Sequence, residues 1–211
     1  NEKPIPHISI LGIAQDAGYP QAGCYQKHCM NGWKNHAARL NPTSLGIIDP
    51  IGKQKFIFEA TPSFPKQLYQ LEQLAPDSEY SLNGIFLTHA HIGHYTGLMF
   101  LGHEAMGANN IAVYAMPRMK TFLENNGPWS QLVNYKNIDL KPLSENKTEL
   151  FGSIKVTPFL VPHRDEYSET VGYKIEGPNK SAIFIPDINK WNVWKRNLAE
   201  LIATVDYAFL D

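Results

Sequence analysis

The chain has 211 residues, of which 43% are hydrophobic and 18% are charged, and its formal net charge at pH 7 is -1. This length and composition predict one globular domain over residues 1–211 and leave little room for extended disorder. The near-neutral charge, with no basic run, argues against a large nucleic acid or a membrane surface as a partner, and no apolar stretch approaches the ~18 residues of a membrane-spanning helix.

The N-terminal region is expected to form a strand over residues 7–14, followed by a loop rich in glycine, proline and small residues. In this loop, Cys24 and Cys29 flank His28. They form a local disulfide if the protein is exported, bind a structural metal together with His28, or stay buried thiols. A closed zinc site takes four protein ligands and only three are near, so a disulfide or inert thiols are slightly favoured.

The start of the sequence also bears on the compartment. Asn1 stands where a methionine would begin an untrimmed chain, and no signal segment follows it. This fits either a trimmed chain or a mature exported chain that has lost its leader, so both a cytoplasmic and a periplasmic location stay open.

Residues 43–75 are predicted to form two strands and a helix. The strands cover 43–49 and 53–60 and are joined by a tight turn. A helix is expected from about 64 to 75, because Ser63 is a suitable N-cap and apolar residues then recur at helical spacing. Its apolar face should pack against the sheet.

The stretch 84–98, GIFLTHAHIGHYTGL, carries the strongest chemical signal. A short apolar strand ends in three histidines within six residues, His89, His91 and His94, and a helix begins at Tyr95. Alternation places the first two imidazoles on one side of the extended segment, and the third lies at the helix start. Convergent neutral imidazoles are suited to a zinc-class cation, so we interpret them as metal ligands and not as separate core or surface histidines.

The remainder of the chain alternates helices and strands. Helices are expected over 96–106, 117–125, 129–135 and 190–204, and strands over 111–116, 137–143, 151–163, 169–177, 180–186 and 205–211. His163 follows a strand and a proline, and Asp187 follows another apolar strand. Either residue alone is unremarkable, because aspartate at a strand end usually serves a turn. Together with the three histidines they complete a plausible ligand set.

The motif THAHIGHYTGL resembles the His-x-His-x-Asp-His signature of the metallo-β-lactamase superfamily, with Gly93 in place of the aspartate. The loop after the first strand resembles the branch that holds the pyrroloquinoline-quinone biosynthesis proteins B and the cyclic-phosphate phosphodiesterases. The resemblance implies an α/β (α+β) fold, a four-layer αββα sandwich of the metallo-β-lactamase type, and its C-terminal part is absent here if the chain is shortened.

The same resemblance assigns roles to individual residues. His89, His91 and His163 would hold a first metal, and His94 would serve a second metal that shares Asp187 with the first. Asp187 and His94 would also act in catalysis. Glu59 would support a metal ligand without touching the metal, or simply cap its strand in water, and Asp16 would lie at the rim of the site.

Two departures from the family pattern concern the second metal. Gly93 cannot ligate a metal or orient water, and the sequence stops at Asp211 before the last family histidine, so either the chain is shortened or the second site is incomplete. We therefore expect one tightly bound zinc ion with a second weak or absent, while iron and manganese stay alternatives.

These observations predict a metal-dependent hydrolase that uses a metal-bound hydroxide on a small-molecule substrate, a small phosphodiester or cyclic phosphate. One alternative is a degenerate, non-hydrolytic protein that binds or carries a small ligand. Another is a hydrolase of lactones, lactams or thioesters. The oligomeric state stays open, a dimer included.

Overall fold

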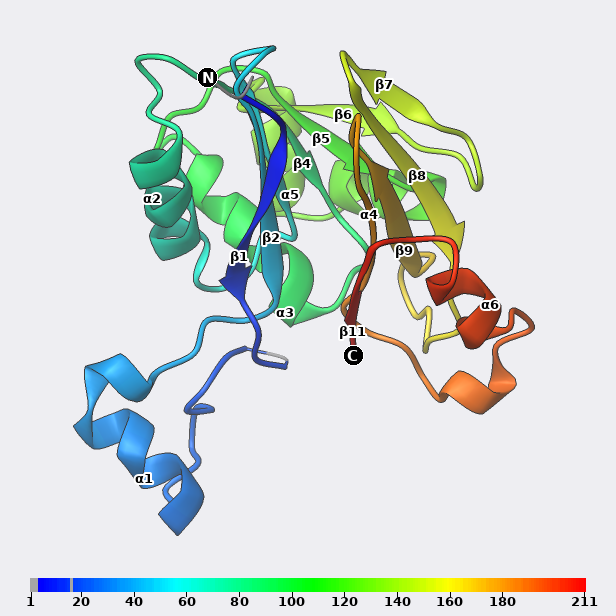
Figure 1. Ribbon diagram of the computed structural model, residues 1–211. Coiled ribbons are helices and arrows are strands. Elements are labelled where there is room, and N and C mark those ends of the chain that lie inside the picture. Colours follow the sequence, from blue (N-terminus) through cyan, green and yellow to red (C-terminus); the bar gives the residue numbers. More distant parts are fainter. Residues whose placement is uncertain (1–3, 16) are drawn as a thin grey trace.

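The computed structural model describes residues 4–15 and 17–211, and within them the strands form two sheets (Figure 1). The six-stranded sheet has the order β1-β2-β3-β4-β5-β6, and its strands are His7–Gly12, Ser44–Asp49, Gln54–Phe58, Ser81–Phe86, Ile111–Ala115 and Ile138–Pro142. The five-stranded sheet has the order β11-β10-β9-β8-β7. In chain order β7 to β11 are Glu149–Phe151, Ile154–Leu160, Val171–Glu176, Ser181–Ile185 and Tyr207–Leu210.

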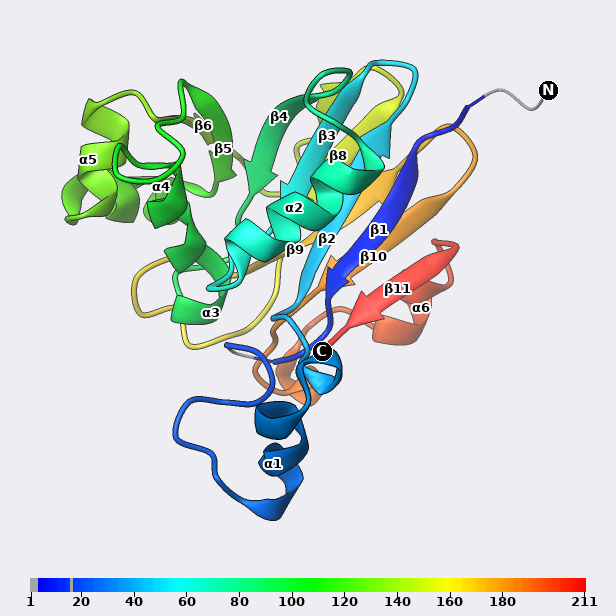
Figure 2. The same ribbon diagram turned by 90° about the vertical axis from the view of Figure 1, so that its left-hand side faces the viewer.

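Helices cover the outer face of each sheet. Figure 2 shows α2 lying across the six-stranded sheet. The helices on this sheet are α2 (Phe64–Leu74), α3 (Ile92–Tyr95), the 3₁₀ segment Thr96–Leu101, α4 (Pro117–Asn125) and α5 (Trp129–Asn134). The five-stranded sheet is covered by the 3₁₀ segment Trp191–Val193 and by α6 (Leu198–Ile202). The predicted four-layer αββα sandwich is therefore confirmed.

Alternation along the central strands explains the layering. In β2 and β3, Ile48 and Ile57 face the helices, whereas Ile47, Phe56 and Phe58 face the other sheet. Strands that are buried on both faces read as nearly continuous apolar runs, as these do. A third cluster, on the outer face of the five-stranded sheet, joins β8 and β10 to the segment after β10. The two sheets are thus held by one apolar layer between them and one on each side.

The helix expected over 190–204 is wrong as a single element. The segment forms two short pieces, Trp191–Val193 and Leu198–Ile202. The second starts as a separate helix because Asn197 caps it by accepting hydrogen bonds from the N–H groups of Ala199 and Glu200. The helix expected over 96–106 is shorter than predicted and is a 3₁₀ helix that ends at Leu101. The helices expected over 64–75 and 117–125 are confirmed within a residue.

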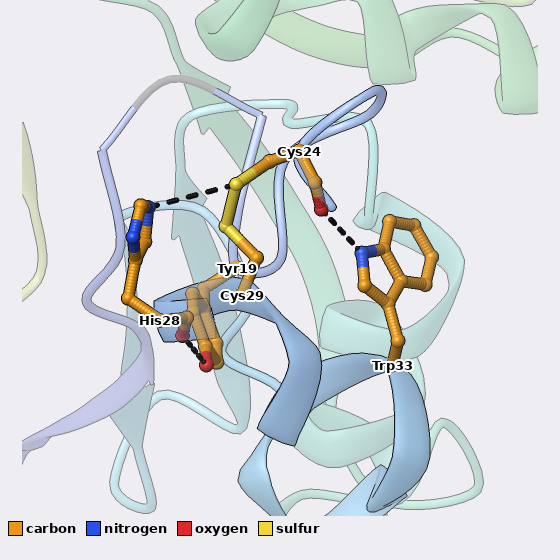
Figure 3. Close-up of a disulfide and its surroundings, with 5 residues drawn as sticks. All are labelled: Tyr19, Cys24, His28, Cys29 and Trp33. Carbon is orange, nitrogen blue, oxygen red and sulfur yellow. Dashed lines mark hydrogen bonds between the residues drawn. A yellow bond between two sulfur atoms is a disulfide. The ribbon is translucent and has the colours of Figure 1, made fainter. Parts of the chain in front are cut away.

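Residues 13–15 and 17–43 form an arm that leaves the sandwich between β1 and β2. It contains α1 (Lys27–Lys34) and the 3₁₀ turn His36–Ala38, and it projects from the end of the sheets in both views (Figures 1 and 2). Within the arm, Cys24 and Cys29 form a disulfide (Figure 3). Among the described residues, no helix is long and apolar enough to cross a membrane.

Candidate metal centre

The candidate centre lies where several strands end together. β3 and β4 are parallel, and β8 runs in the same direction as β10 because each is antiparallel to β9. Glu59, the histidine loop, His163 and Asp187 follow the carboxyl ends of β3, β4, β8 and β10 in turn. Side chains distant in sequence therefore meet at one end of the sandwich.

Backbone hydrogen bonds fix the loop that carries the three histidines. The N–H of His94 donates to the carbonyl of His91 at 2.9 Å, and the N–H of Ala90 donates to the Ser168 hydroxyl at 2.8 Å. The following turn lies against the residues after β3: Gly97 donates to the carbonyl of Ala60 at 2.8 Å, and a β-carbon at Gly97 would lie 2.1 Å from the carbonyl oxygen of Thr61. Only glycine permits this approach.

Four side chains from this region each bring one potential ligand atom to within 4.8 Å of the other three: His89, His91, His163 and Asp187. The Nδ1 of His91 and the Nε2 of His163 are 2.9 Å apart. The Oδ2 of Asp187 lies 3.5 Å from the Nε2 of His89 and 3.3 Å from the Nε2 of His163. Three imidazole nitrogens and one carboxylate oxygen thus face a common point.

The protonation of these imidazoles suits a cation. Burial lowers the pKa of His89 to about 3 and lowers the pKa of His163 as well, against the opposing effect of Asp187. Both rings are therefore neutral at pH 7 and keep a nitrogen lone pair, which is the form that binds metal. The Nε2 of His89 is buried and has no hydrogen-bond partner within the described residues. Buried polar atoms normally have a hydrogen-bond partner, and a metal ion would satisfy this nitrogen instead. The residues therefore fit a zinc-class cation.

His94 and Glu59 form a buried pair beside this point. The Nδ1 of His94 lies 2.5 Å from Glu59 Oε2, and Glu59 Oε1 accepts a hydrogen bond from the N–H of Thr88 at 2.9 Å. Burial raises the pKa of Glu59, while His94 acts against this rise. The Nε2 of His94 lies 3.6 Å from Asp187 Oδ2. Glu59 thus orients His94 toward Asp187, as a carboxylate orients a metal-binding histidine.

The second predicted metal position would lie near His94. Gly93 lies buried in α3 between His91 and His94 and offers no ligand atom. The Nε2 of His94 lies 3.6 Å from Asp187 Oδ2. Potential ligand atoms of Glu59, His89 and His94 also lie within 4.8 Å of one another.

Two residues of the loop after His163 touch the centre and were not predicted. The Oε2 of Glu166 lies 2.7 Å from the Nε2 of His91, which directs the Nδ1 of the same ring toward His163. The Nη2 of Arg164 lies 3.5 Å from the Nδ1 of His91. The one sequence signal for both is their closeness to His163 along the chain.

Asp211 is a third unpredicted residue near the centre. Its carboxylate accepts hydrogen bonds from the Gln15 side chain and, at 3.3 Å, from the N–H of Ile188. Burial and the neighbouring Asp187 raise the pKa of Asp211. Asp16, predicted at the rim, lies outside the described residues.

The Cys24, His28 and Cys29 group is separate from the centre. The structure joins the two cysteines in a disulfide with Cα atoms 6.0 Å apart, one of the expected alternatives (Figure 3). The His28 ring lies 3.6 Å from Cys24 Sγ, and the Trp33 indole donates to the carbonyl of Cys24 at 2.7 Å. These contacts stabilise the arm.

Comparison with known proteins identifies the class. A family model described as the beta-lactamase superfamily domain matches residues 54–211. The chain therefore belongs to the metallo-β-lactamase superfamily, as its motif indicates.

Several known proteins are similar to the chain. The chain is 32% identical over 100 residues to the coenzyme PQQ synthesis protein B of Klebsiella pneumoniae (strain 342); this match covers 44% of the chain and 32% of that relative. Among solved structures, a Zn(2+)-bound PqqB from Methylobacterium extorquens has a TM-score of 0.78 at 23% identity, covering 97% of this chain and 72% of that one. A diphosphatase from the PhnP family has a TM-score of 0.60 at 18% identity, covering 85% and 64%.

Proposed function

We propose that the protein is a metal-dependent hydrolase whose substrate is a small phosphodiester or cyclic phosphate. One observation carries the proposal: Asp187 Oδ2 lies within 3.3 to 3.6 Å of the Nε2 atoms of three histidines, one of which is buried and otherwise unpartnered. The similarity to a Zn(2+)-bound PqqB and to a PhnP-family diphosphatase supports the metal and the phosphate chemistry respectively.

The residues that would hold the cation are His89 through Nε2, His91 through Nδ1, His163 through Nε2, and Asp187. A zinc-class ion there would lower the pKa of a coordinated water and polarise the phosphoryl oxygen. The three histidines would be the permanent ligands and Asp187 the exchangeable one, so that a position would be open to water and substrate, as in catalytic zinc sites. We propose that one ion binds tightly and that a second is weak or absent, because Gly93 supplies no carboxylate.

The chain's own side chains would do the remaining work. Asp187 would orient the attacking water through a carboxylate oxygen and take its proton. His94, fixed through Nδ1 by Glu59, presents Nε2 to the same space and would hold the water from the other side. The guanidinium of Arg164, 3.5 Å from the ligand nitrogen of His91, would stabilise the negative charge of a phosphate.

Metal content and turnover test this proposal together. The purified chain is loaded with zinc, dialysed, analysed for metal, and then assayed with bis(p-nitrophenyl) phosphate and with lactone, lactam and thioester reporters. His91→Ala should lose the metal and all turnover. The matched control is His103→Ala, which removes an exposed histidine outside the centre. Turnover that persists in His91→Ala would refute the assignment.

A second candidate is a non-hydrolytic protein of the same fold that binds or carries a small ligand. Gly93 favours it, because the family aspartate at this position orients the attacking water. Retention of one equivalent of zinc without turnover of any reporter would support this candidate. Turnover of a lactone, lactam or thioester reporter, with none of the phosphodiester, would instead indicate a hydrolase with that other substrate class.

A further inference from the structure

An open cleft of about 430 Å³ lies beside the candidate metal centre. The lining residues used below come from α4 and the segment after it and from the loop after His163: Arg118, Phe122, Asn125, Asn126, Glu166 and Tyr167. Glu166 belongs to both places, since it lines the cleft and its Oε2 lies 2.7 Å from the Nε2 of His91. One imidazole ring therefore separates the cleft from the point that the ligand atoms face.

An aromatic surface forms part of the cleft wall. The ring of Tyr167 packs against Phe122 at a centroid distance of 5.3 Å and an interplanar angle of 34°, yet Tyr167 stays 62% exposed. Phe122 is in turn held by Tyr95 in an edge-to-face contact at 5.5 Å. A large exposed aromatic on an anchored neighbour gives a planar ligand a surface on which to stack.

The cleft is also lined by the guanidinium of Arg118, most of whose hydrogen-bond donors are available to a ligand. The guanidinium of Arg118 donates from Nη2 to the carbonyl of Asp165 at 2.9 Å, and its backbone N–H donates to the Glu169 carboxylate. Among the ion pairs of the described residues, none includes Arg118. Since a guanidinium has five donors, most of them stay available to an anionic group.

Two amide side chains complete the polar part of the wall. Asn125 and Asn126 each donate an N–H to a carbonyl of α4, at 2.9 and 2.8 Å, which fixes their orientation. Each keeps its Oδ1 as an acceptor for an N–H or hydroxyl donor of a ligand. A stacking surface, an available cation and oriented acceptors are the features that recognise a ring with polar edges attached to an anion.

We propose that this cleft binds the planar, heteroaromatic part of a phosphate ester whose phosphoryl group lies at the metal centre. The position of the phosphoryl group rests on the proposed function, whereas the binding of the ring does not. Tyr167 would stack on the ring, Arg118 would pair with a phosphate oxygen, and the asparagines would accept hydrogen bonds from the ring edge or the sugar.

Calorimetric titration of the zinc-loaded full chain tests the cleft without turnover. The probes are adenosine 5′-monophosphate, adenosine, and ribose 5-phosphate, which separate the ring from the phosphate. Tyr167→Ala should weaken binding of the nucleotide and of adenosine about tenfold, within the range for base stacking on aromatic side chains, and leave ribose 5-phosphate unchanged. Arg118→Gln should weaken both phosphates and leave adenosine unchanged.

Matched controls lie outside the cleft. Tyr69→Ala removes a tyrosine of equal exposure, 63%, from α2, and Lys120→Gln removes a cation from α4. Both should bind all three probes like the wild type. Equal affinity of the nucleotide and ribose 5-phosphate, or a Tyr167→Ala variant that binds like the wild type, would overturn the inference.

The outcomes separate this inference from the proposed function. Hydrolysis of phosphodiesters without any ring-dependent binding would support the proposed function and refute the role of the cleft as a ring-binding site. If ring-dependent binding is observed and is lost in Tyr167→Ala, but no ester is hydrolysed, the proposed hydrolase function is refuted. The proposal that the cleft binds a heteroaromatic ring is then still supported.

Discussion

Replacement of Glu59 by alanine is expected to destabilise the fold by about 4 kcal/mol. The Glu59 side chain is fully buried, with one carboxylate oxygen 2.9 Å from the Thr88 N–H and the other 2.5 Å from His94 Nδ1. Alanine removes the acceptor from two buried donors at once. Removal of one member of a buried, hydrogen-bonded pair costs about 3–5 kcal/mol, because the remaining groups stay desolvated.

The choice of alanine matters because Glu59 has a left-handed φ of 75°. Glycine would relax this backbone and offset part of the loss, whereas alanine keeps the β-carbon and the same constraint. The matched control is Glu79→Ala. Glu79 lies 3.4 Å from Lys53, and their side chains are 61% and 54% exposed, so this pair contributes at most about 1 kcal/mol.

Urea unfolding in the presence of a chelator measures both variants without a contribution from bound metal. The midpoint of Glu59→Ala should fall well below that of Glu79→Ala at an unchanged slope. A loss of stability that is equal in the two variants, or below about 1 kcal/mol for Glu59→Ala, would refute the assignment of Glu59 as a buried orienting carboxylate.

Three further predictions use the same protein. Gly93→Asp should raise the zinc retained after dialysis from one equivalent to two, as measured by mass spectrometry; one equivalent in both proteins would contradict the reasoning. Lys55→Ala should cost about 3 kcal/mol in urea, because the 1% exposed side chain packs in the core and donates to the Ala75 carbonyl at 2.6 Å, whereas Lys53→Ala should cost little. Lys180 holds the pKa of Asp206 below its usual value, so this carboxylate stabilises the fold above about pH 4 and the stabilisation is lost as pH falls through the lowered pKa. The melting temperature of Asp206→Asn should therefore fall less steeply than that of the wild type as the pH is lowered below about 4. The same pH dependence of the melting temperature in both proteins would contradict this.

The parts of the centre that the sequence predicts are those with local signals. Three histidines within six residues at a strand end need no long-range information, whereas His163 and Asp187, unremarkable alone, are recognised as candidate ligands through the family resemblance. The structure brings all five to one place, and Glu59 beside them. Helices with a clear apolar period, such as α2, are also predictable, although the Ser63 side chain makes no capping hydrogen bond there.

The parts that sequence reasoning missed depend on distant contacts. Glu166 meets His91 across 75 residues of sequence, and no spacing rule relates the two. The stripe over 190–204 has a helical period, yet its apolar side chains reach the sheet from two short pieces, because Asn197 restarts the helix. An amphipathic period identifies the buried face of a segment and does not reveal breaks within it.

The candidate metal ligands come from both sheets, which has a consequence for the mechanics of the molecule. His89 and His91 follow a strand of one sheet, while His163 and Asp187 follow strands of the other. A cation held by all four would act as a reversible cross-link that closes a loop of about 70 residues, comparable in entropy to a disulfide, about 4 kcal/mol. Chelation would then remove this cross-link and leave the two sheets held together by the apolar layer between them.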